Sequence, residues 1–230
     1  MTDNVVDVER AKPVTLGGQV YAELCDRLIG GELPPGEKVS LRSLAEALGT
    51  SVMPVREAVS RLVADGALTV SPNRAISVPI MTLSAYQELT TVRMAIEGFA
   101  AERAALHRTP SDLTLIRRYD AAFRHQCVTE TRDTAVAMRA NRDFHFAVYA
   151  AAGLPSLMKI ISGLWLKIGP LLNFDMRFSP ERLSLGGAEA HHGRCLEAII
   201  ARDGPAARAA MTGDIAGTAA FIATSGQLHD

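Results

Sequence analysis

Apolar residues recur at helical spacing along most of the chain, beginning with residues 16–30. The apolar face of this first pattern consists of Val20, Leu24, Leu28 and Ile29. A Gly- and Pro-rich segment, residues 30–36, ends it. A second apolar stripe covers residues 41–48, between Ser40, which is favoured at helix N-termini, and Gly49, which is favoured just past their ends. The pattern therefore predicts two helices within the first fifty residues.

A third helical pattern runs to Gly66, with Pro54 in its first turn, where a missing N–H removes no intrahelical hydrogen bond. Its apolar face consists of Val55, Ala58, Val59 and Leu62. Residues 67–70 and 75–78 then alternate apolar and polar positions around the turn at 71–74, which predicts a two-stranded hairpin. Two helices joined at a glycine turn and followed by a hairpin indicate a winged helix-turn-helix, whose second helix enters the DNA major groove.

From residue 82 onward the pattern is helical and is interrupted at short turn signals. The clear breaks are Thr109-Pro110, Gly153-Leu154-Pro155, Ser179-Pro180 and Asp203-Gly204-Pro205, with a softer one near residues 130–133. Six helices with short connections pack as antiparallel neighbours. We therefore predict a mainly α fold: a flexible arm at residues 1–13, a winged helix-turn-helix with a small β-wing at 14–80, and an antiparallel six-helix bundle at 82–230.

The composition restricts the class of protein and its compartment but does not indicate a function. The chain has 24 Lys and Arg against 25 Asp and Glu, so net charge alone does not indicate nucleic-acid binding. Cys25, Cys127 and Cys195 are too widely spaced for a CxxC metal pair and are odd in number, which is typical of a reducing cytoplasm. We find neither an apolar run of about 20 residues nor a secretion signal, so we predict a cytoplasmic protein without a membrane partner.

Candidate DNA contacts fall at three matched positions of the predicted module. Arg56 points away from the apolar face of the second helix, where donors reach base edges. Arg42 begins the preceding helix, within reach of a phosphate, and Arg74 lies at the hairpin tip. Each arginine alone is typical of a solvated surface, but the three together favour DNA contact. The other candidates are Thr50 and Ser51 at the start of the second helix and Arg61 farther along it.

A candidate metal site comes from the bundle. Asn141 and His145 lie four residues apart, which places them on one helix face, about 6 Å from each other. His192 lies eleven residues before Asp203 and Asp214 eleven after it, so an antiparallel hairpin turning there brings the two level. Two imidazoles, a carboxylate and an amide oxygen suit a divalent transition metal such as zinc or nickel. Polar residues in a hydrated cavity are the alternative that spacing leaves open.

The segment LRSLAEALGTSVMPVREAVSRLVADGAL resembles the N-terminal domain of GntR-family bacterial transcription regulators. It departs from the family at Val52-Met53, where a polar pair is usual, and at Pro72-Asn73-Arg74, where the wing is usually glycine-rich. Residues 82–230 are similar to the FCD domain, the effector-binding bundle of the FadR subgroup. The similar segments are ELTTVRMAIEGFAAERAA, NRDFH and HHGRCLEAIIARDGPAARAAM.

The resemblance implies a homodimer, most often a repressor, on a pseudo-palindromic double-stranded operator. It also implies a divalent metal, with the family's ligand positions falling on Asn141, His145, His192 and Asp214, the last in place of the usual His. A small organic-acid effector on that metal would change the spacing of the two DNA-binding domains. Arg93 resembles the family's pocket arginine, which would pair with the effector carboxylate. Its alternative is a surface ion pair with Glu97.

Two other functions stay open from the sequence. The first is a metal-dependent enzyme with an accessory N-terminal domain. Its weakness is the general base, since Asp143 and Glu197 are the nearby candidates and helical phase favours neither. The second is a fatty-acyl-binding regulator with a metal-free bundle, which the four potential ligands disfavour.

Overall fold

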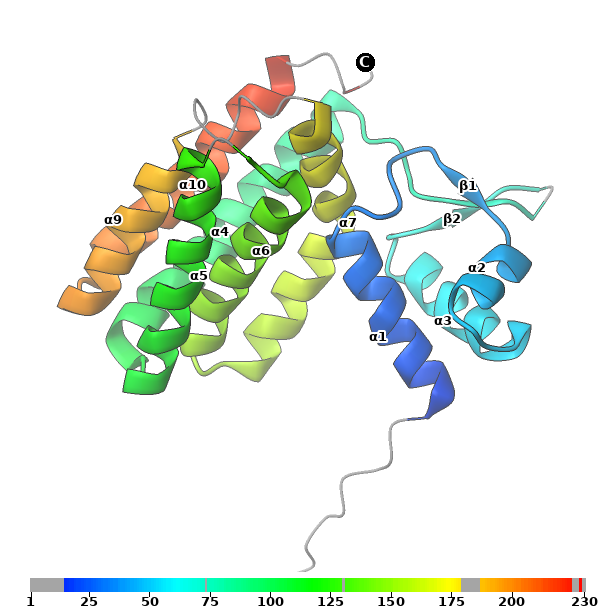
Figure 1. Ribbon diagram of the computed structural model, residues 1–230, viewed down its shortest axis with the longest axis horizontal. Coiled ribbons are helices and arrows are strands. Elements are labelled where there is room, and N and C mark those ends of the chain that lie inside the picture. Colours follow the sequence, from blue (N-terminus) through cyan, green and yellow to red (C-terminus); the bar gives the residue numbers. More distant parts are fainter. Residues whose placement is uncertain (1–14, 73, 130, 179–186, 225–227, 229–230) are drawn as a thin grey trace, which may run out of the picture.

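The computed structural model describes residues 15–72, 74–129, 131–178, 187–224 and 228, with the backbone alone at 174–178. The N-terminal unit, residues 15–78, holds three helices and a small antiparallel sheet of strand order β1-β3-β2 (Figure 1). Its elements are α1 (Leu16–Ile29), β1 (Lys38–Val39), α2 (Leu41–Ala47), α3 (Val52–Ala64), β2 (Thr69–Val70) and β3 (Ile76–Ser77). The predicted arm at residues 1–13 and the turn residue Asn73 lie outside the described residues.

The helix ends of this unit follow from local chemistry. Ser40 and Ser43 form a reciprocal capping box at the start of α2, with each side chain accepting the other's backbone N–H. Gly49 (φ 59°) and Gly66 (φ 71°) take the left-handed conformation after α2 and α3. The predicted apolar face of α3 is confirmed, since its four residues are all buried. β1 was not predicted, because two residues are too short to show alternation.

Six helices form the bundle of residues 83–224 in the described part of the chain (Figure 1). They are α4 (Leu83–His107), α5 (Pro110–Val128), α6 (Thr134–Ala151), α7 (Pro155–Phe178), α9 (Ala188–Ala201) and α10 (Gly204–Thr224). α10 packs along α4 and α9, and α5 packs along α6. The predicted mainly α fold with an antiparallel six-helix bundle is confirmed, and its helix ends lie at the predicted breaks; residues 179–180 themselves lie outside the described ranges. No described helix is long and apolar enough to cross a membrane.

α1 joins the two parts, because it packs against α3 on one side and α7 on the other (Figure 1). The amide of Asn173 in α7 donates two hydrogen bonds, to the carbonyl oxygen of Ile29 at 2.6 Å and to that of Gly169 at 2.7 Å. A Cβ on Gly169 would lie 2.8 Å from the Ile29 Cα, and one on Gly31 would lie 2.1 Å from the Asn173 Cβ. The end of α1 therefore meets α7 at a contact that only glycine permits.

Candidate functional site

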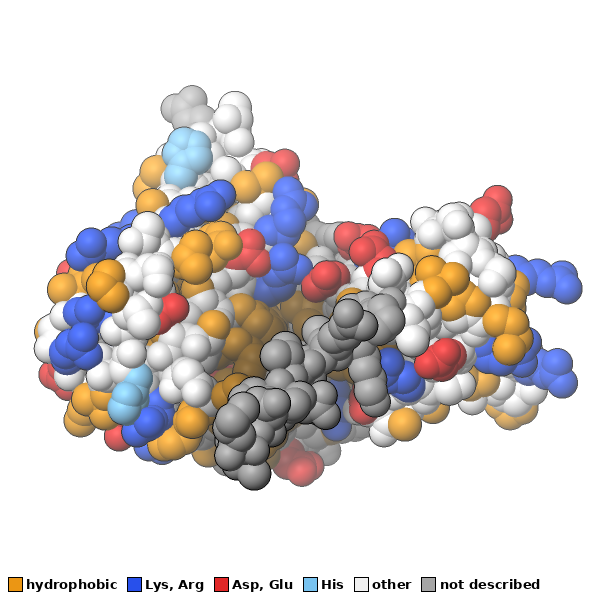
Figure 2. Space-filling model, turned by 90° about the horizontal axis from the view of Figure 1, so that it is seen from below, with side chains coloured by type: hydrophobic (Ala, Val, Ile, Leu, Met, Phe, Trp, Pro, Cys, Tyr) orange, Lys and Arg blue, Asp and Glu red, His pale blue; other side chains and the backbone are white. Residues whose placement is uncertain are grey.

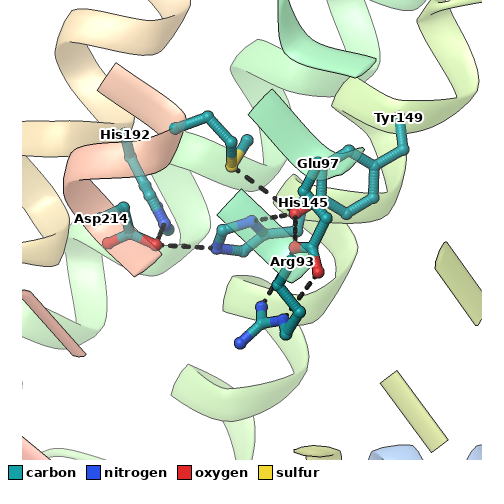
Figure 3. A network of polar contacts seen from close by, with 7 residues as sticks. Arg93, Glu97, His145, Tyr149, His192 and Asp214 are labelled. Atoms are coloured by element: carbon teal, nitrogen blue, oxygen red, sulfur yellow. Dashed lines mark hydrogen bonds and ion pairs between the residues drawn. The ribbon is translucent and has the colours of Figure 1, made fainter. Parts of the chain in front are cut away.

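Three buried side chains from three helices point at one another in the bundle (Figure 3). The Nε2 atoms of His145 on α6 and His192 on α9 lie 3.2 Å and 3.9 Å from Oδ2 of Asp214 on α10. One ligand atom from each of the three lies within 4.8 Å of the others. The predicted hairpin register is thus observed: His192 and Asp214 face each other across the turn between α9 and α10.

The polar atoms of this cluster fit a divalent cation. Zn–N bonds of about 2.0–2.1 Å place the donors of a tetrahedral site about 3.3 Å apart. The His145–Asp214 separation of 3.2 Å matches this value, and the His192–Asp214 separation of 3.9 Å is longer. Both ring nitrogens of His192 and Oδ1 of Asp214 are buried and have no hydrogen-bond partner among the described residues. Such atoms cost about 1–3 kcal/mol each when unpaired, and a shared cation would satisfy them.

The ionisation states of the cluster also suit a cation. Burial lowers the pKa of His192 to about 3, which keeps its imidazole neutral and its lone pair free. Burial would raise the pKa of Asp214, but the neighbouring histidines, His145 first, outweigh burial and lower that pKa to about 2. A neutral imidazole beside an ionised carboxylate is the combination that metal binding requires.

Behind the cluster, hydrogen bonds continue from His145 to Arg93 through two further residues (Figure 3). Nδ1 of His145 lies 2.9 Å from the Tyr149 hydroxyl, which donates to Glu97 Oε2 at 2.5 Å. Glu97 also accepts from Arg93, whose Nε and Nη2 lie 2.6 Å and 3.1 Å from its two oxygens. We call Arg93, Glu97, Tyr149 and His145 the relay.

The ion pair between Arg93 and Glu97 is present, as one of the two alternatives predicted. Its predicted location at the surface is wrong, because the pair is buried. Arg93 is 4% exposed and Glu97 is fully buried, because this face of α4 packs against the rest of the bundle. Burial lowers the pKa of Arg93, but the charge and hydrogen bonds of Glu97 raise it above its ordinary value. Nη1 of Arg93 makes no hydrogen bond within the described part of the chain and is the nitrogen left for a ligand.

A cavity beside the cluster reaches from His145 and Asp214 to Ile29 of the N-terminal unit. It is lined by Ile29, Arg93, Phe123, Met138, Asn141, Arg142, His145, Trp165, Leu172, Asn173, Ala188, Asp214, Ile215 and Thr218. Asn141, the fourth predicted ligand, is half-buried in this lining. The volume is about 30 Å³, which is room for about two water molecules. An organic acid therefore enters only if part of the wall moves.

Several residues in or around this site were not predicted. Tyr149 is four residues after His145, as Glu97 is four after Arg93, so helical spacing alone could have suggested both. Asn173 had no such signal, because its partner Ile29 is 144 residues away. His191, predicted to be exposed, is half-buried, and its Nδ1 lies 2.8 Å from Nη2 of Arg194.

The predicted DNA contacts lie on the N-terminal unit. Figure 2 shows Lys and Arg side chains projecting from its outer end, at the right. Arg42 at the start of α2, Arg56 on α3 and Arg74 beside the wing turn are all exposed, and Arg74 has a positive φ of 64°. Ser51 precedes α3 and is exposed, whereas Thr50 is half-buried.

Arg61 is placed differently from the other candidates. Its guanidinium carbon lies 3.8 Å from the centre of the Tyr21 ring, and the Tyr21 hydroxyl donates to Asp65 at 2.8 Å. This arginine therefore helps to pack α3 against α1 within the unit. A DNA contact by Arg61 stays a prediction.

The two carboxylates considered as general bases for the enzyme alternative, Asp143 and Glu197, lie outside the cavity. Asp143 pairs with Arg142 at 2.9 Å, and Glu197 is exposed. Neither carboxylate belongs to the cavity lining, so neither is placed as a general base for a ligand held there.

Two family models match the chain. The model described as bacterial regulatory proteins, gntR family, matches residues 16–78, and that of the FCD domain matches residues 88–217. The first match covers the unit with α2, α3 and the sheet, and the second covers most of the bundle and all four predicted metal ligands.

Individual relatives agree with these models. HTH-type transcriptional regulator McbR of Escherichia coli K12 is 34% identical over 72% of this chain and 74% of its own length. A solved structure of E. coli McbR/YncC superposes with a TM-score of 0.83 at 30% identity, covering 91% of this chain and 98% of that one. The probable D-xylose utilization operon transcriptional repressor of Paenarthrobacter nicotinovorans is 28% identical over 90% of this chain and 89% of its own.

Proposed function

We propose that this chain, which belongs to the gntR family of bacterial regulatory proteins and carries an FCD domain, is a ligand-controlled regulator of the FadR type. Its relatives are transcriptional regulators and not enzymes, and the chain is a DNA-binding transcription regulator. The finer proposal is that a small organic acid, bound at a divalent metal in the bundle, sets the affinity for DNA. One observation supports it most: the cluster of His145, His192 and Asp214, with its unpaired buried atoms, borders a cavity that reaches α1.

DNA reading is proposed for the exposed face of α3. Arg56 projects there and would donate to base edges in the major groove. Arg42 and Arg74 would hold the phosphate backbone on either side, with Ser51 and Thr50 at the start of α3. Arg61 stays the weakest of these candidates, because its side chain already packs on Tyr21.

The metal, zinc or nickel, would be held by Asn141, His145, His192 and Asp214. When bound, it supplies a Lewis-acidic centre with open positions for a ligand carboxylate. Nη1 of Arg93 would add a charged donor to the same ligand. The protein itself contributes the buried, neutral imidazole of His192, the ionised Asp214 and the apolar walls that exclude water.

Control of DNA binding would follow from the size and position of the cavity. A volume of about 30 Å³ admits no organic acid until a wall moves. Ile29 and Asn173 form the wall nearest the N-terminal unit, and they are hydrogen-bonded to each other. A ligand that displaces this wall changes how α1 sits on α7 and favours the state with weaker DNA binding.

The protein is further proposed to act as a homodimer in the cytoplasm. Val92, Phe99 and Leu106 are 40%, 40% and 45% exposed and recur every seven residues along α4, as expected of a face that packs against a second copy. Two copies would read the two halves of a pseudo-palindromic operator. Repression is favoured as the outcome, since one relative is named as a probable transcriptional repressor.

DNA selection with the full-length, zinc-loaded protein tests this function. We expect enrichment, from a random double-stranded pool, of one pseudo-palindrome whose half-sites lie about 10 base pairs or a multiple of that apart. Affinity for the enriched site should exceed that for scrambled DNA by at least about 10³-fold. Failure to enrich any sequence, with equal binding to all duplexes, would contradict the proposal.

The link between cavity and α1 gives a second prediction. Asn173→Ala removes both hydrogen bonds between the Asn173 side chain and the backbone, so the backbone around residues 29–33 should open more often. Losing about 1–1.5 kcal/mol of local stability corresponds to roughly tenfold faster amide hydrogen exchange in that segment. Hydrogen-exchange mass spectrometry measures this directly.

Asn141→Ala is the matched control, since Asn141 lines the same cavity but makes no hydrogen bond with α1. It should leave exchange at residues 29–33 unchanged, and Asn173→Asp, which lacks the amide donor, should behave like Asn173→Ala. Unchanged exchange in both Asn173 variants would show that this contact does not hold α1 to α7.

A further inference from the structure

We infer that Tyr149 and Glu97 are positioning residues that keep the proton of His145 on Nδ1 and thereby present its Nε2 lone pair to the cation. The inference rests on the proposed metal site and concerns residues outside it. Tyr149 lies one turn beyond His145 on α6, and Glu97 reaches the same hydroxyl from α4 (Figure 3).

The direction of each hydrogen bond follows from what each group can donate. Arg93 donates to both oxygens of Glu97, so this carboxylate is the acceptor at the end of the relay. The single hydroxyl proton of Tyr149 points to Glu97 at 2.5 Å in preference to the Met211 sulfur at 3.5 Å, because a carboxylate is the stronger acceptor. The hydroxyl oxygen is then left to accept a hydrogen bond from His145.

The proton that it accepts is the one on Nδ1 of His145, 2.9 Å away. A neutral imidazole has one N–H, so with the proton on Nδ1 the lone pair is on Nε2. That lone pair faces Oδ2 of Asp214 at 3.2 Å. Two acceptors at this distance repel each other unless a cation lies between them, and a divalent metal satisfies both.

Without the relay, the His145 tautomer protonated on Nε2 would be more populated. Asp214 would draw the proton to Nε2, where it would donate to the carboxylate and block the metal ligand. Tyr149 and Glu97 oppose this, because moving the proton would leave the Tyr149 oxygen, which is fully buried, facing a second lone pair. Partners of this kind also raise the basicity of the ligating nitrogen. The relay therefore favours metal over proton at the position between His145 and Asp214.

Zinc affinity tests the inference in the full-length protein. Tyr149→Phe keeps the ring and removes the hydroxyl, and it should weaken zinc binding about 10- to 100-fold, measured by competition with a chromogenic chelator. Glu97→Gln should weaken it in the same direction. Tyr119→Phe is the control, because Tyr119 lies on α5, outside both the relay and the cavity lining; its zinc affinity should stay within twofold of wild type.

A spectroscopic measurement separates positioning from loss of structure. In zinc-loaded protein labelled with ¹⁵N-histidine, His145 should show a protonated Nδ1 whose proton resonance is shifted downfield by the Tyr149 hydrogen bond. Tyr149→Phe should move that resonance upfield while the amide spectrum of the bundle is retained.

The outcomes distinguish this inference from the proposed function. Wild-type protein that binds no zinc would overturn the metal site itself. Wild-type protein that binds zinc, with Tyr149→Phe and Glu97→Gln binding equally well, would overturn the relay alone. A protonated Nε2 on His145 in the zinc-free, neutral state of Tyr149→Phe, against a protonated Nδ1 in wild type, would support it without any metal.

Discussion

Replacing His145 and His192 together by alanine should reduce the bound transition metal from about one ion per chain to none. Each replacement removes a buried nitrogen that faces Oδ2 of Asp214, and one carboxylate with an amide oxygen is a poor site for zinc or nickel. Inductively coupled plasma mass spectrometry on protein purified without chelator and reloaded with zinc gives the stoichiometry. The loss should be complete rather than partial, because two of the four proposed ligands are gone.

His191→Ala is the matched control for this double variant. His191 is the immediate neighbour of His192, is half-buried, bonds to Arg194 and is not among the three clustered side chains. It should retain about one ion per chain. Metal retained by the double variant, or lost equally from His191→Ala, would mean that the ion is held elsewhere.

Arg56→Ala should remove sequence-specific DNA binding while leaving the fold intact. A bidentate arginine–guanine contact contributes about 1–3 kcal/mol of discrimination, so two copies in a dimer contribute about 2–6 kcal/mol. We therefore expect at least a 30-fold loss of affinity for the selected operator and little change for scrambled DNA. Arg56 is exposed on α3 and outside the apolar face, so circular dichroism and melting temperature should match wild type.

Arg118→Ala on α5 controls for the loss of one positive charge, because Arg118 is exposed and belongs to the bundle rather than to the N-terminal unit. Its operator affinity, measured by fluorescence anisotropy at fixed salt, should equal that of wild type. An Arg56 variant with wild-type operator affinity would show that α3 does not read DNA through this side chain.

Local patterns predicted the parts of the fold that depend on neighbours in sequence. The apolar face of α3, the capping serine of α2 and the helix breaks were read from spacing alone, because each depends on residues within about one helical turn. The same logic placed His192 opposite Asp214, since a tight turn at residues 203–205 fixes the register of the two helices.

Contacts between distant segments were beyond such patterns. The two-residue strand β1 exists only because Lys38 and Val39 pair with Ser77 and Ile76. The bond from Asn173 to Ile29 depends on how α1 packs on α7, for which neither residue carries a local signal. Tyr149 could have been suspected from its position one turn after His145, but its link to Glu97 needed the packing of α6 on α4.

Arg93 was predicted from the sequence, but its burial changes the role that it can have. The sequence left two alternatives for this residue: a contact with the effector, or an ion pair with Glu97. In the fold the ion pair forms through Nε and Nη2 of Arg93, and the Arg93 side chain also lines the cavity. Arg93 thus orients Glu97 within the relay, and its contact with a ligand stays a proposal for Nη1 alone.

We propose above all that a carboxylate bound at the buried metal controls DNA binding. The most direct test is operator affinity of the zinc-loaded protein with acetate, succinate or citrate added, for wild type and for the variant with His145→Ala and His192→Ala. We predict that at least one of these acids weakens wild-type binding tenfold or more and leaves the variant unaffected. Operator affinity that ignores all three acids, or that responds equally in the variant, would contradict the claim.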